Sequence, residues 1–171
     1  MDGFEKINND AEQTAGAIYS SLGDTMPSIL SLIRWTEENF GIRITVSFKN
    51  SDEFTVSGLE YFDPGIGEYR IFVNGRDYEY RQRFTLCHEI AHIIRNSEKA
   101  FGFSEGEIYS ASGEERFCDH FSAAFLMPEE IFIERWNAIR EDIDFKKARI
   151  ASIFRVSGQA VYYRAKELGL I

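Results

Sequence analysis

Two histidines four residues apart, with a glutamate directly after the first, form the strongest chemical pattern in the chain. The segment reads His88-Glu89-Ile90-Ala91-His92, which is the pattern H-E-x-x-H. Residues four apart on a helix lie on one face, so both imidazoles can reach a single metal ion. We therefore predict that His88 and His92 bind Zn²⁺ and that Glu89 is the general base. Manganese or iron would also suit such donors.

A catalytic zinc ion needs a third protein ligand and one open position. Glu115 and Asp119 are again four residues apart, so in a helix both can face the histidines. We predict that Glu115 binds the metal and that Asp119 accepts a hydrogen bond from a ligating imidazole. His120 is a rival ligand, although it points about 100° away from Asp119 around the helix.

Other candidate site residues are weaker. Cys87 and Cys118 could supply thiolates, but each directly precedes a proposed site residue and so faces elsewhere. We expect both cysteines to be reduced core residues. An oxyanion-stabilising group is not identified, and Tyr109, Tyr78 and Tyr80 are guesses for that role.

The elements that position these residues follow from the spacing of apolar side chains. Helical spacing predicts helices over residues 25–40, capped by Thr25 or Asp24, over residues 81–95, and over residues 113–127, before Pro128. Between residues 43 and 73, short runs of β-type residues predict a small antiparallel sheet. The fold class is therefore α+β, with this sheet packed on helices.

The last β-type run lies just before the histidine helix. It comprises Arg70, Ile71, Phe72 and Val73. An exposed strand at this position could bind an extended substrate by edge pairing. An ordinary interior strand is the alternative.

The end of the chain is basic, although the formal net charge of the whole chain is -9. Residues 145–154 and 158–168 read as two helices joined by Arg155-Val156-Ser157, a layout like a helix-turn-helix. The basic side chains of residues 145–171 would suit contact with DNA phosphates. Docking on the rest of the protein or on a protein substrate is the alternative, and we favour it.

Length and composition limit the class of protein. The chain has 171 residues, of which 44% are hydrophobic and 27% are charged, which is typical of a folded globular domain. The sequence contains no apolar stretch of membrane-spanning length and no signal-peptide pattern. We expect a cytoplasmic protein without a membrane partner, organised as an N-terminal extension or helix (1–24), a catalytic domain (25–140) and a C-terminal helical pair (141–171).

Two blocks of the sequence resemble the ImmA/IrrE metallopeptidases. The first is RQRFTLCHEIAHIIRN at residues 81–96, and the second is EERFCDHFSAAFLMPEE at residues 114–130. In the second block Cys118 and Ser122 replace common alanines, and Ala91 takes a frequent glycine position in the first. These small substitutions leave the proposed ligands in place.

The resemblance implies a zincin-like fold and a zinc endopeptidase. It also implies a substrate class, since better-known members cleave helix-turn-helix repressors and thereby derepress genes in bacteria and phages. The alternative function is a regulatory DNA- or protein-binding module with a vestigial metal site. A toxin-like or housekeeping peptidase is a third possibility.

Overall fold

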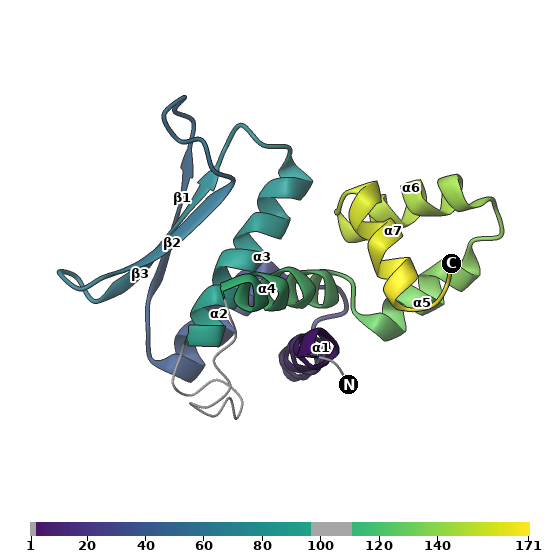
Figure 1. The fold of residues 1–171 in the computed structure, drawn as a ribbon, viewed down its shortest axis with the longest axis horizontal. Helices are drawn as coiled ribbons and strands as arrows, with labels where there is room; N and C mark the ends of the chain where they lie inside the picture. Colours follow the sequence, from purple (N-terminus) through teal and green to yellow (C-terminus); the bar gives the residue numbers. More distant parts are fainter. Residues whose placement is uncertain (1–2, 97–110) are drawn as a thin grey trace.

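The computed structural model describes residues 3–96 and 111–171, which form a helical body with one small sheet at its side (Figure 1). The predicted α+β class is confirmed. In chain order the elements are α1 (Gly3–Leu22), α2 (Ile29–Phe40), β1 (Ile44–Lys49), β2 (Gly58–Asp63), β3 (Glu68–Asn74), α3 (Glu79–Asn96), α4 (Ala111–Leu126), α5 (Glu129–Ala138), α6 (Ile143–Phe154) and α7 (Gly158–Glu167).

The sheet has the order β1-β3-β2 and is mixed rather than antiparallel. The hairpin strands β2 and β3 pair antiparallel, but β1 pairs with β3 in parallel. The antiparallel expectation was wrong for β1 because β1 and β2 are joined by a long connection that places them on opposite sides of β3. Strand composition predicts the strands but not this order.

The expectation that residues 70–73 form an exposed edge strand was also wrong. Arg70, Ile71, Phe72 and Val73 lie in β3, which is paired with β1 on one side and with β2 on the other. Ile71 and Val73 are fully buried, so their backbone and side chains are both used by the fold. The free edges of this sheet belong to β1 and β2.

Helix α1 packs along α4. Its buried stripe consists of Ile7, Ala11, Ala15 and Ile18, which has the spacing of one helix face. Opposite it, α4 presents three buried phenylalanines, and the rings of Phe117 and Phe121 stack at 6.1 Å between centroids. The N-terminal extension is therefore part of the core that supports α4.

Helix α2 begins later than predicted. Its cap is Ser28, whose hydroxyl accepts a hydrogen bond from the Ser31 amide, rather than Thr25 or Asp24. Pro27 explains the shift, because a proline disfavours helical backbone in the residue before it. The predicted C-terminal boundary is confirmed, since Gly41 adopts the left-handed conformation that glycine permits.

The C-terminal helices α5, α6 and α7 form a separate lobe on the side of the body away from the sheet (Figure 1). The two predicted terminal helices and the Ser157 cap are confirmed, with the Ser157 hydroxyl accepting from the Ala160 amide at 3.1 Å. Arg164 of α7 is only 1% exposed and ties this lobe to α1 and α4. Over the described residues, no helix combines the length and apolar character needed to cross a membrane.

Candidate metal centre

The two histidines of the H-E-x-x-H pattern lie on α3 and point toward α4. Helix α3 buries its opposite side with Ile90, Ile93 and Ile94, which fixes the face that carries the imidazoles. Nε2 of His88 and Nε2 of His92 lie 3.1 Å apart. The one-turn spacing therefore brings both ring nitrogens to one point.

Glu115 of α4 reaches the same point. One of its carboxylate oxygens lies 3.2 Å from Nε2 of His88, and the other lies 3.2 Å from Nε2 of His92. The Glu115 side chain is 60% exposed, whereas that of His88 is 15% exposed. The cluster is thus closed on the protein side and open to solvent on the side of Glu115.

Each histidine has its own carboxylate partner on the other ring nitrogen. Nδ1 of His88 lies 2.9 Å from Asp119, and Nδ1 of His92 lies 3.1 Å from Glu114. A carboxylate acceptor holds the ring proton on Nδ1 and leaves the Nε2 lone pair free. Asp119 occupies the orienting position expected for it, and Glu114 has the same relation to His92.

Glu114 was missed by the reasoning from sequence, which gave it no role. A signal was available, because each ligating imidazole usually has its own acceptor and Asp119 can serve only one. Asn96 also donates to the Glu114 carboxylate at 3.1 Å. The end of α3 therefore fixes this second acceptor.

The convergence of these atoms fits a cation. With the ring protons on Nδ1, two nitrogen lone pairs and two carboxylate oxygens face one another at 3.1–3.2 Å. These electron-rich atoms repel one another unless a positive charge lies between them. Ligands 2.0–2.1 Å from a tetrahedral zinc ion are about 3.4 Å apart. The donor set therefore suits a divalent metal after an adjustment of a few tenths of an ångström.

Cys118 is a competing third donor by distance. Its sulfur and one ring nitrogen from each of His88 and His92 lie within 4.8 Å of one another. Two observations favour Glu115 instead: each of its oxygens lies 3.2 Å from one of the two Nε2 atoms, and burial, together with four nearby carboxylates, raises the pKa of the Cys118 thiol. Cys87 is also buried, with a pKa raised to about 12, in line with the expected core role of both cysteines.

Glu89 lies beside the histidines and is 8% exposed. Burial raises the pKa of Glu89, the positive forms of His88 and His92 oppose that change, and the charge of Glu60 adds to it. The carboxylate packs against Gly58 at the start of β2, where a Cβ atom would lie 2.6 Å from Oε1 of Glu89. The close approach of strand to helix thus defines the position of Glu89.

His120 is used elsewhere. Its Nε2 lies 3.1 Å from Glu12 of α1, and its Nδ1 lies 3.5 Å from Glu167 of α7. Burial would lower the pKa of His120, but its bonds to these two carboxylates outweigh burial and raise the pKa. The helical rotation that separates His120 from Asp119 therefore turns it toward α1 and α7.

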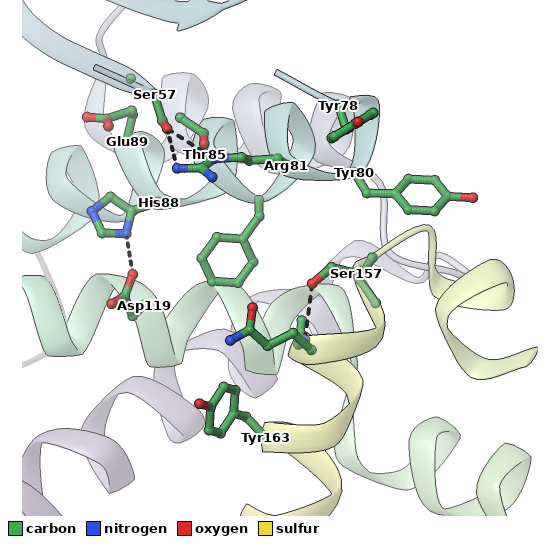
Figure 2. Close-up of a pocket in the computed structure, with 15 residues that line it drawn as sticks. Ser57, Tyr78, Tyr80, Arg81, Thr85, His88, Glu89, Asp119, Ser157 and Tyr163 are labelled. Carbon is green, nitrogen blue, oxygen red and sulfur yellow. Dashed lines mark hydrogen bonds and ion pairs between the residues drawn. The ribbon is translucent and has the colours of Figure 1, made fainter. Parts of the chain in front are cut away.

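The remaining candidates lie around the cluster or outside it. Tyr78 and Tyr80 line a cavity that also includes His88 and Glu89 (Figure 2), and Tyr109 lies outside the described residues. Residues 70–73 are not among those that line this cavity. Arg70 lies 3.4 Å from Asp63 within the sheet.

Comparison with known proteins gave one matching family and several solved structures of similar fold. The family model of the IrrE N-terminal-like domain, peptidase M78, matches residues 38–166. A solved structure of a Mycobacterium tuberculosis transcriptional regulator has a TM-score of 0.59 and 16% identity, covering 95% of this chain and 52% of that one. The chain thus spans about half of that regulator, and at this identity the likeness concerns the fold. The search of curated proteins gave no match.

The family match includes the histidine pair, Glu115 and Asp119 as well as both C-terminal helices up to residue 166. The clustered imidazoles and carboxylates and the three-stranded sheet beside α3 agree with a metallopeptidase family. The chain belongs to the peptidase M78 family of IrrE N-terminal-like domains.

Proposed function

We propose that the protein is a zinc-dependent endopeptidase in which His88, His92 and Glu115 bind the metal. The observation that carries this proposal is the meeting of two Nε2 atoms and the Glu115 carboxylate within 3.2 Å, next to a buried glutamate. Zinc, when bound, supplies a Lewis acid that polarises a peptide carbonyl and makes water more acidic. Imidazole and carboxylate together are a common zinc donor set.

Glu89 is the proton carrier of the reaction. Its carboxylate accepts a proton from the attacking water and delivers it to the nitrogen of the leaving amine. Burial raises the pKa of Glu89, which moves the group toward the pH at which it both takes up and returns a proton efficiently. Asp119 and Glu114 hold the two imidazoles in orientation.

The peptide substrate adds as a strand to the free edge of β2. This edge replaces the one first expected on β3, because β2 pairs only with β3 in the described sheet. Gly58 of β2 touches Glu89, so a strand bound there carries its backbone past the general base. Main-chain hydrogen bonds provide affinity in this mode without requiring a given sequence.

The proposed substrate is a helix-turn-helix transcriptional repressor, whose cleavage would derepress genes. Support comes from the family resemblance, and the fold neighbour is described as a transcriptional regulator. We propose a cytoplasmic site of action on the same basis.

A regulatory DNA-binding module is the weaker alternative. Three of the six basic residues of 145–171 form ion pairs within the protein: Arg164 is buried against Glu12, and Arg155 pairs with Glu79. Lys147 pairs with Asp144 at 2.7 Å. Fewer cations remain for phosphates than the sequence suggests.

Glu89→Gln tests the enzymatic proposal. We expect the purified variant to retain one zinc ion per chain and to lose at least about a hundredfold in turnover, the usual size of a general-base contribution. The assay is digestion of the helix-turn-helix repressor encoded beside the gene. Full activity of the variant would refute the proposed mechanism, and salt-dependent binding of duplex DNA without zinc-dependent cleavage would favour the alternative.

A further inference from the structure

A cavity of about 860 Å³ begins at His88 and Glu89 and extends between α3 and α7 (Figure 2). Ser57 and Gly58, at the start of β2, form part of its rim. Its size falls within the range of ligand-binding cavities, about 300–1,000 Å³. The cavity is therefore continuous with both the proposed metal centre and the strand edge.

The far side of this cavity is lined mainly by aromatic and apolar groups. Phe84, on α3 one turn before His88, lines the cavity together with Tyr163 and Ala160 of α7 and with Val156 of the preceding turn. Tyr163 is 54% exposed although much of its ring is apolar. Arg81, the cationic side chain on the rim, is already bound to Ser57 and to Asp77.

Helix α7 is held firmly in place as a wall. Arg164 donates two hydrogen bonds of 2.7 Å to Glu12 and a third to the Met127 carbonyl. At the other end of the cavity, Arg155, in the turn before α7, pairs with Glu79 at the start of α3. These two attachments join α7 to α1, and the turn before α7 to α3.

We propose that α7 is the specificity wall of the peptidase, and that the space between Phe84 and Tyr163 receives a large apolar or aromatic side chain of the substrate next to the scissile bond. This inference rests on the proposed peptidase function. A chain paired with β2 turns alternate side chains to the same face, so one side chain near Glu89 enters the cavity. The helix in the recognition position of a helix-turn-helix thus faces substrate instead of DNA.

The first test is a cleavage profile. Zinc-loaded protein is incubated with a tryptic peptide mixture, and cleavage sites are read by mass spectrometry. We expect phenylalanine, tyrosine or leucine at one position flanking the cut. Tyr163→Ala should weaken this preference about tenfold, the usual discrimination from an apolar pocket. Gln159 is an exposed residue on the cavity wall, and Gln159→Trp should shift the cleavage preference toward smaller substrate side chains.

Lys166→Ala is the control on the same helix. Lys166 is an exposed residue of α7 and is not among the residues that line the cavity. Its profile should equal that of the wild type. If the wild-type protein cleaves peptides and both Tyr163→Ala and Gln159→Trp give its cleavage profile unchanged, the proposed specificity wall is overturned and the peptidase function stays intact.

A binding measurement separates the two proposals if no cleavage occurs. Fluorescein-labelled decapeptides that differ only in a central Phe, Ala or Asp are titrated into zinc-loaded Glu89→Gln protein and followed by anisotropy. A preference for Phe that disappears on adding Tyr163→Ala supports the wall even when the peptidase function fails. Equal binding of the three peptides, or tighter binding of the Asp peptide through Arg81, overturns it.

Discussion

Asp119 accepts a hydrogen bond from Nδ1 of His88 at 2.9 Å, so the Nε2 lone pair of this ring is directed at the point where His92 and Glu115 converge. Burial by itself would lower the pKa of His88. The hydrogen bond to Asp119 and its negative charge more than offset burial, and the pKa is raised. One carboxylate therefore sets both the orientation and the proton affinity of the imidazole.

Asp119→Asn should weaken zinc binding by about 10- to 100-fold, the usual loss when an outer partner of a ligating histidine is removed. The amide can still occupy the space, but it carries no charge and can present its NH₂ group to Nδ1. Competition with a chromogenic chelator measures the change. Glu130→Gln, at an exposed position on α5, is the control and should leave affinity unaltered. An Asp119→Asn protein with wild-type affinity would show that Asp119 does not orient the ligand.

Glu114→Gln should have a smaller but similar effect through His92. Its carboxylate is shared between His92 and Asn96, at 3.1 Å from each, so part of the orientation survives through a neutral acceptor. We expect a loss of zinc affinity of about tenfold. If Glu114→Gln proved indistinguishable from wild type in the chelator assay, the role of Glu114 would be limited to holding Asn96.

Zinc affinity should fall on acidification, and the fall should begin above pH 6.5. In the metal-free protein the pKa of His88 is raised above its ordinary value of 6.5, so protons compete with the metal already at a pH where a free histidine is neutral. Affinity is fully present above the raised pKa and is lost as pH decreases through it. Asp119→Asn removes the main cause of the shift and should move the decline to lower pH. An unchanged midpoint would contradict this assignment.

Gly58→Ala should impair catalysis more than metal binding. The added Cβ would lie 2.6 Å from Oε1 of Glu89 and would collide with the methyl group of Thr85, so the carboxylate or β2 must move. A displacement of about 1 Å at a reacting group can cost about a hundredfold in rate. Peptide hydrolysis and zinc content are the two measurements. Gly16→Ala, where no atom lies within 4 Å of the new carbon, is the control.

The local part of the candidate centre could be predicted because it depends on helix geometry alone. His88 and His92, like Glu115 and Asp119, are four residues apart, and any helix places such pairs on one face. That α3 and α4 lie against each other was supported by the resemblance to a family rather than by spacing. Glu114 was missed since its neighbour Glu115 already filled the ligand role.

The non-local part of the fold was harder to predict. The run from Arg70 to Val73 has the composition of a strand, but strand order depends on tertiary contacts, so its central position could not be inferred. Arg164 was counted with the basic side chains of the chain end. A sum of charges cannot predict that this side chain is buried. The stripe formed by Ile7, Ala11, Ala15 and Ile18 was by contrast present in the sequence and was overlooked.

Breaking the ion pair between Arg164 and Glu12 should destabilise the whole fold. Arg164 is 1% exposed, and its two nitrogens lie 2.7 Å from the Glu12 oxygens. Arg164→Met leaves the Glu12 carboxylate with His120 alone. We expect a loss of about 3 kcal/mol in the free energy of unfolding, the lower end for a broken buried pair, because the Glu12 side chain is 28% exposed.

The pH dependence of the free energy of unfolding tests whether the Arg164–Glu12 ion pair is the source of this stability. Burial would raise the pKa of Glu12, but Arg164 and His120 lower it from 4.5 to about 2. The stabilisation is thus present above pH 4.5 and is lost as pH falls toward 2. Urea denaturation between pH 3 and 7 should show a steeper loss for the wild type than for Arg164→Met. The double variant Glu12→Gln with Arg164→Met should recover part of the lost free energy of unfolding, because no unpaired charge remains. If this double variant is no more stable than Arg164→Met, the loss comes from the packing of the arginine side chain alone.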